Sequence, residues 1–258
     1  MTDTDPVSRT ILLLDIERFS DRDDVEQAYL RRMLYDVCDH ALLAADVDET
    51  LRLREDRGDS VMELIDPNAS VISLLRTLLT DVPAQLRTRN RMASSSAQMR
   101  LRAVVASGYV KRDAFGWVGS QLNHACRLLD GEPLRASLRE RPDDLALCVS
   151  DAVYEGVVCH SHTGVPADEF KRIAVPSKNG ELGAWLHRPA PAEQPTGGPG
   201  PGTGTTERDL RPGAGPAPGT HFGGTHFGGG AIGGDNHGIS TGQVTGDIHF
   251  DAGRGERR

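Results

Sequence analysis

Apolar and polar positions alternate in two distinct periods along the first 188 residues. A continuous apolar run at 10–16 (TILLLDI) is typical of a strand buried on both faces of a sheet. Apolar residues at helical spacing predict amphipathic helices. The predicted helices are 24–45, 70–86, 120–130, 133–140 and 151–159, and the further strands are 99–106, 145–150, 170–175 and 182–187. Residues 87–97 are polar and predict a loop, and Ser107-Gly108 predicts a turn after the strand at 99–106.

The stretch 51–65 (LRLREDRGDSVMELI) predicts a β-hairpin. Apolar residues flank a Gly58-Asp59 turn on both sides, which is a strong hairpin signal. Five ionic residues crowd the tip, although a hairpin needs only one turn former. A solvated tip would explain them. A site for chemistry, shared with a second carboxylate at Asp15, would explain them as well.

Composition changes sharply after Pro189. The part before it has ordinary apolar content and is long enough for one domain with a core. Helices alternating with mixed strands favour an α/β or α+β fold with helices over one sheet. Residues 189–219 are rich in Pro, Gly and Thr, which predicts a flexible linker. Residues 220–258 are Gly-rich and cannot bury enough apolar surface to fold as a globule.

Charge and cysteine usage narrow the function classes. The net charge of −8 argues against a general nucleic-acid binder, which needs cations to neutralise phosphates. Four cysteines are scattered without a CxxC pair, which predicts reduced thiols and a cytoplasmic protein. They are Cys38, Cys126, Cys148 and Cys159. The first residues are polar and the run at 11–14 is too short to span a membrane, so we expect neither export nor a membrane partner.

Two groups of residues are candidates for chemistry. Asp15 ends a buried strand, where an unpaired charge is costly, so it either caps the following helix or holds a metal ion. Asn123 and Arg127 lie four apart on a predicted helix and therefore project from one face. They are either a surface pair or part of a site.

Four stretches, in order, resemble the catalytic domain of class III nucleotidyl cyclases. They are DIERFS at 15–20, the Gly58-Asp59 hairpin tip, the strand ending in Gly108, and GSQLNHACR at 119–127. The resemblance covers about residues 9–188, and the hairpin also looks like that of an actinobacterial cyclase-like group. It implies an α+β fold with a ferredoxin-like mixed, largely antiparallel sheet covered by helices.

The resemblance also implies a reaction and its residues. A nucleoside triphosphate would be converted into a cyclic nucleotide and pyrophosphate with two Mg²⁺ or Mn²⁺ ions per site. Carboxylates suit such hard cations, so Asp15 and Asp59 would hold them together with the backbone carbonyl of Ile16. Arg127 would stabilise charge on the phosphorus and Asn123 would position the ribose. Both would come from a second subunit, which predicts a homodimer.

The residues that would contact the triphosphate and the base depart from the family. Lys178 would contact the triphosphate. Glu55, four before the hairpin Asp, favours guanine, but its partner position holds Gly116 and Arg57 replaces an apolar residue. Three outcomes stay open: cyclic GMP, another product such as a cyclic pyrimidine nucleotide, or a degenerate cyclase fold that binds nucleotide or nothing and acts as a signalling adaptor.

The tail holds a THFGG repeat at 220–229 and a β-prone segment at 233–250. Short β-prone segments of low charge can stack between chains. The segment resembles bacterial amyloid signalling motifs, which implies an effector protein with a matching motif. Its β-favouring residues are Ile239, Val244, Ile248 and Phe250. A disordered tail without a partner is the alternative. A metal site is disfavoured by the spacing of its histidines, which are His221, His226, His237 and His249.

Overall fold

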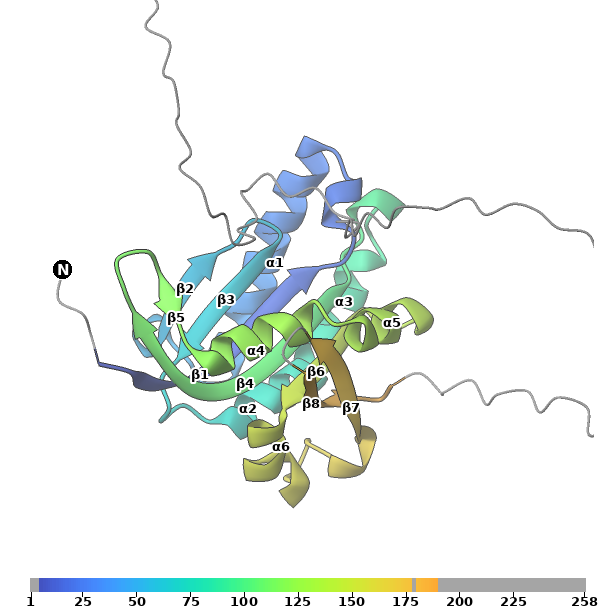
Figure 1. Cartoon of the computed structure of the whole chain (residues 1–258). Helices are drawn as coiled ribbons and strands as arrows, with labels where there is room; N and C mark the ends of the chain where they lie inside the picture. The colour runs from blue at the N-terminus through green and yellow to red at the C-terminus, as the bar shows by residue number, and fades with distance from the viewer. Residues whose placement is uncertain (1–4, 178–179, 190–258) are drawn as a thin grey trace, which may run out of the picture. The chain divides into compact units, whose positions relative to one another are not determined.

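The computed structural model describes residues 5–177 and 180–189 of the 258 (Figure 1). The strands are β1 (Val7–Ile16), β2 (Arg52–Asp56), β3 (Ser60–Ile65), β4 (Leu101–Arg112), β5 (Trp117–Val118), β6 (Leu145–Ser150), β7 (Phe170–Ser177) and β8 (Gly180–His187). The α-helices are α1 (Asp24–Ala44), α2 (Val71–Leu79), α3 (Asp81–Asn90), α4 (Ser120–Leu129), α5 (Glu132–Glu140) and α6 (Asp151–Gly156). Lys178 and the segment 233–250 lie outside the described residues.

One sheet organises these elements. Its strand order is β2-β3-β1-β4-β6-β8-β7, and β5 pairs with β4. β1 pairs antiparallel with β3 and β4, while β4 and β6 are parallel. The elements from β1 to β4 therefore form a β-α-β-β-α-β unit in ferredoxin-like order, with α2 and α3 in the place of the second helix. This confirms the predicted α+β fold with a mixed sheet.

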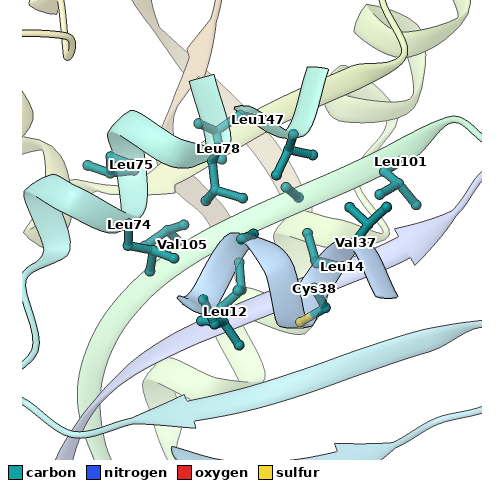
Figure 2. Packing of buried hydrophobic residues seen from close by; sticks show 14 of the residues in the cluster. Leu12, Leu14, Val37, Cys38, Leu74, Leu75, Leu78, Leu101, Val105 and Leu147 are labelled. Carbon is teal, nitrogen blue, oxygen red and sulfur yellow. The ribbon is translucent and has the colours of Figure 1, made fainter. Parts of the chain in front are cut away.

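Each face of the sheet carries its own hydrophobic core. Because side chains alternate along a strand, β1 contributes Leu12 and Leu14 to one face and Ile11 and Leu13 to the other. Helices α1, α2 and α3 cover the first face, and Figure 2 shows Val37 and the other labelled side chains packed there. Helices α4 and α5 cover the second face. The continuous apolar run at 10–16 thus reflects burial on both sides, as predicted.

Helix α1 begins where the sequence provides a cap. The Asp23 side chain accepts hydrogen bonds from the backbone N–H groups of Val25 and Glu26. Glu26 in turn accepts from the Asp23 backbone N–H at 3.2 Å, which completes a capping box. The capping box therefore fixes where the loop between β1 and α1 ends and the helix begins.

The predicted helix at 70–86 is in fact two helices. α2 ends at Leu79 and α3 begins at Asp81, with Thr80 between them at φ −118°. Pro83 explains the break, because it has no N–H for the carbonyl of Leu79 and its ring would clash there in a continuous helix. α3 then runs to Asn90, through part of the predicted loop, and Arg87 and Arg89 suit the negative end of its dipole.

The predicted turn at Ser107-Gly108 is wrong, because β4 continues to Arg112. The chain turns later, where the Asp113 side chain accepts from the N–H groups of Phe115 and Gly116. Gly108 has another role. A Cβ built on it would lie 2.3 Å from Cγ of Gln121, so a side chain there would collide with α4. None of the described helices combines the length and apolar character needed to cross a membrane.

Candidate functional site

The end of β1 brings together the two carboxylates predicted from the sequence. Asp15 lies opposite Ser60 of β3, and the N–H of Ile16 donates to the carbonyl of Asp59 at 3.1 Å. This bond ties the hairpin tip to the strand end. Burial raises the pKa of the Asp15 carboxyl to about 6; the nearby Arg102 guanidinium opposes that rise, and the charge of Asp59 adds to it.

Arg102 is the residue of this site that the sequence did not reveal. It lies opposite Asp15 in β4, and its guanidinium forms an ion pair with that carboxylate. Both side chains are largely buried, and Nε of Arg102 has no hydrogen-bond partner within the described residues. The available signal was one cation within the apolar run 101–106. Its meaning depends on strand register, which the local sequence does not contain.

The loop that leaves β1 has an unusual backbone. Arg18 adopts a left-handed conformation with φ 55° and ψ 38°, which residues with a side chain rarely occupy. Its Nε donates to Asp21 at 2.7 Å. Arg22 donates to the carbonyl of Glu17 at 3.1 Å and also to that of Arg18. The loop is therefore held against the end of the sheet by its own side chains.

A cavity of about 620 Å³ opens beside the Asp15–Arg102 pair. Its lining is Glu17, Arg18, Arg100, Arg102, Arg135 and Arg139, so that five guanidinium groups face one carboxylate. The outer pairs, such as Arg135 with Asp130 at 3.2 Å, are exposed and contribute little. A polyanion could therefore displace them at small cost. Arginine forks suit phosphate oxygens, which makes this cavity suitable for a phosphate chain.

The donor set fits a divalent cation that is shared with such a ligand. Within the described residues, no three Asp, Glu, His or Cys side chains converge as a metal cage. Mg²⁺, however, is usually bound by only one or two carboxylates, with waters and substrate phosphates completing its shell. Asp15, Asp59 and the Ile16 carbonyl are oxygen donors of that kind. Arg102 competes with any cation for the Asp15 carboxylate.

Asn123 and Arg127 lie on α4, away from this pair of carboxylates. Asn123 is exposed, and its N–H donates to the carbonyl of Gly119 at 3.0 Å in the first turn of α4. Arg127 lines a different cavity, of about 700 Å³, between α4, the start of α5 and the end of β7. Within one chain, the described structure does not bring these two residues into the cavity beside Asp15.

The proposed base-reading positions do meet. A Cβ built on Gly116 would lie 3.7 Å from Oε1 of Glu55, and both residues line a cavity of about 370 Å³ between the two hairpins. Gly116 has φ 146°, so the Asp or Cys of the family would be strained here. Arg57 lies 3.8 Å from Glu55 and donates to Sγ of Cys126 at 3.4 Å. Arg57, whose presence the sequence did not explain, thus links the hairpin tip to α4.

Comparisons with known proteins found similar solved structures only. No family model matches the chain, and no curated protein matches it. Among solved structures, it is similar to the catalytic core of a rhodopsin-guanylyl cyclase with converted specificity in complex with ATPalphaS. That match has 14% identity, covers 73% of this chain and 99% of that one, and has a TM-score of 0.47.

Two bacterial structures match comparably. A bacterial light-regulated adenylyl cyclase shares 16% identity over 71% of this chain and 91% of that one, with a TM-score of 0.49. An adenylate/guanylate cyclase/hydrolase from Silicibacter pomeroyi shares 18% identity over 72% of this chain and 100% of that one, with a TM-score of 0.48. Values of this size do not assign an activity, which has to follow from the residues of the site.

Proposed function

We propose that the chain is a nucleotidyl cyclase that converts a nucleoside triphosphate into a cyclic nucleotide and pyrophosphate. The observation that carries this proposal is the carboxylate pair Asp15 and Asp59, joined through the Asp15–Arg102 ion pair to an arginine-lined cavity. Few ligands match both features. A triphosphate that carries a divalent cation does, because its oxygens suit arginine and its cation suits carboxylates.

The reaction requires one bond to form and one to break. The ribose 3′-oxygen bonds to the α-phosphorus, the bond from that phosphorus to the β-phosphate bridge oxygen breaks, and the hydroxyl proton passes to solvent. Asp15, Asp59 and the Ile16 carbonyl would hold Mg²⁺ or Mn²⁺, which would polarise the phosphate oxygens when bound. Arg18, Arg100 and the α5 arginines orient the phosphate chain and offset its charge.

The same proposal includes a homodimer. Arg127 suits charge stabilisation at the α-phosphorus and Asn123 suits ribose positioning, but neither lines the cavity beside Asp15 of its own chain. A second copy could supply them. Glu55 could accept hydrogen bonds from the N–H groups of guanine, and Arg57 beside it limits how that base could fit.

A second candidate function follows from the Asp15–Arg102 ion pair. A carboxylate neutralised by arginine holds a cation less well, which favours a domain that binds a nucleotide without turnover. Such a domain would be an adaptor that signals through its tail. Its tail motif, 233–250, would assemble with a matching segment on an effector protein. If a peptide of this sequence stays monomeric and binds no thioflavin, the proposed assembly of the tail is wrong.

The test is product analysis. The purified full chain is incubated with each of the four nucleoside triphosphates and Mg²⁺ or Mn²⁺, and the products are identified by mass. The cyclase predicts one cyclic nucleotide with equimolar pyrophosphate, and its loss in Asp59→Asn. Asp46→Asn is the matched control, because Asp46 is exposed and its left-handed backbone, at φ 58°, suits Asn equally. Four intact triphosphates together with metal-independent nucleotide binding would support the adaptor instead.

A further inference from the structure

A second cavity lies on the α2–α3 face of the sheet and shares no lining residue with the cavity beside Asp15. It has a volume of about 370 Å³, within the range of small-molecule sites. Its lining residues come from the C-terminal end of α2, the start of α3, the end of α5 and its following loop, β6 and the end of β8. Its apolar lining is Leu78, Leu79, Pro83, Leu145 and Leu147.

Three arginines surround this apolar floor, and two of them are already neutralised. Arg141 forms an ion pair with Asp143. Arg188 pairs with Glu169 at 2.5 Å. Arg87 has no ion-pair partner within the described residues, although it lines the same cavity. Asp144 interacts with the charge of Arg87 without a direct contact. The cavity therefore offers one guanidinium that no carboxylate of the described residues contacts.

The position of Arg87 is only partly explained by its helix. A cation in the last turn of α3 interacts favourably with the helix dipole, and Arg89 in the same turn does so as well. Arg89, however, pairs with Asp36 at 3.5 Å and lines no part of this cavity. Arg87 differs from Arg89 because it lines the cavity together with the leucines.

We propose that this cavity binds a small organic monocarboxylate with an apolar body, of the chemistry of a medium-chain fatty acid. The carboxylate would be held by the planar fork of Arg87, which suits two parallel hydrogen bonds. The apolar body would lie against Leu78, Leu145 and Leu147 and be removed from water. A single guanidinium without a carboxylate in contact favours a single negative charge over a phosphate dianion.

The cavity is physically joined to the end of β1. The guanidinium of Arg100 donates to the carbonyls of Arg141 at 2.8 Å and Asp143 at 3.0 Å, which belong to the rim. The same group donates to the carboxylate of Glu17 at 2.9 Å, beside Asp15. A ligand that moves residues 141–143 would therefore also move Arg100, which lines the cavity beside Asp15. The effect on nucleotide binding rests on the proposed function, whereas the proposed carboxylate site does not.

The binding test uses the full chain and three probes in titration calorimetry. Decanoate should bind with one-to-one stoichiometry, decanol at least about tenfold more weakly for lack of charge, and acetate without detectable heat for lack of an apolar body. Arg87→Glu should weaken decanoate binding by at least about tenfold. Arg91→Glu, an exposed residue just beyond α3 and outside the cavity, should leave it unchanged.

Location is tested by a decanoate with a diazirine at its far end. Photolabelling should modify peptides that contain 78–83 or 145–147. Equal binding of decanol and decanoate, equal loss in the two Arg→Glu variants, labelling elsewhere, or binding to anionic phospholipid vesicles but not to free decanoate would each overturn the proposal. None of these measurements needs turnover. They therefore still test the carboxylate site if the chain shows no cyclase activity.

Discussion

Two carboxylates on neighbouring strands of this sheet have opposite surroundings. Glu63 of β3 is 0% exposed and faces α1, where its Oε1 accepts from Arg52 at 2.8 Å and Arg54 at 2.5 Å. Asp15 of β1 faces the other side of the sheet and has a single arginine partner, Arg102, which lines a cavity. Glu63 is fully buried and paired with two arginines, whereas Asp15 is largely buried and paired with one.

This difference is the one expected between a structural carboxylate and the carboxylate that we propose takes part in function. Arg52 and Arg54 each also donate to Asp39 of α1, so the Glu63 cluster fastens the hairpin to the helix. Glu63 is fully buried in this cluster, and its Oε2 has no hydrogen-bond partner within the described residues. At Asp15, burial raises the pKa of the carboxyl to about 6, a state that costs stability at neutral pH and is expected where function requires it.

The largest effect is expected from Glu63→Ala. Removing this carboxylate leaves the Arg52 and Arg54 guanidinium groups with only the half-exposed Asp39 as a shared partner, which should lower the free energy of unfolding by about 3 kcal/mol. Urea unfolding followed by circular dichroism measures it. Glu155→Ala, at an exposed position of α6, is the control. A loss below about 1 kcal/mol would show that the cluster does not fasten the hairpin.

Asp15→Asn should act in the opposite direction on stability. Because the folded pKa is raised from 3.8 to about 6, the folded carboxyl holds its proton more tightly than the unfolded one. Its contribution to stability is fully present below about pH 4 and is lost as the pH rises to about 6. Asparagine does not titrate, so we expect the variant to gain up to about 3 kcal/mol over the wild type at neutral pH.

The measurement is urea unfolding of both proteins in EDTA across this pH window, followed by triphosphate turnover with metal present. Turnover should fall by at least about a hundredfold, because an amide is a poor ligand for a hard cation. A variant that is destabilised at neutral pH as strongly as Glu63→Ala would place Asp15 among the structural carboxylates and would erase the contrast between the two sites.

Much of this arrangement was predictable because it is local. The apolar run of β1, the helical period of α1 and the Gly58-Asp59 turn each reflect burial or backbone geometry within a few residues. The proximity of Asp59 to Asp15 follows from pairing of the hairpin with β1. Arg102 could not be predicted in the same way, since only the register of β4 against β1 places it opposite Asp15.

Gly108 was misread for a related reason. Ser-Gly after an apolar run is a local turn signal, whereas the need for a residue without a side chain arises from α4 packing across the strand. Arg57 likewise had no local explanation, because its contact with Cys126 joins residues far apart in the chain. Contacts between elements, rather than the elements themselves, limited the prediction of the site.

A smaller effect is expected from Gly108→Ala, which tests how the face that bears Asp15 is assembled. The added methyl group would collide with Cβ and Cγ of Gln121, and α4 would have to shift. Overpacking of this kind costs about 1–3 kcal/mol of unfolding free energy. Gly156→Ala is the matched control, since a Cβ there meets nothing within 4 Å. Equal stability of the two variants would show that α4 can move without cost.

The smallest effect is expected in chemical labelling of the cysteines, which reports on both faces of the sheet in one experiment. Cys38 donates to Glu63 at 3.6 Å, and burial raises the pKa of its thiol; burial also raises the pKa of Cys148 to about 12. Both should resist alkylation in the folded chain, while exposed Cys159 reacts first and half-buried Cys126 second. Mass spectrometry of peptides after timed alkylation measures the order. In Glu63→Ala, Cys38 should become reactive while Cys148 stays protected, because only the α1 face is loosened; simultaneous exposure of both thiols would instead show that the two faces open together.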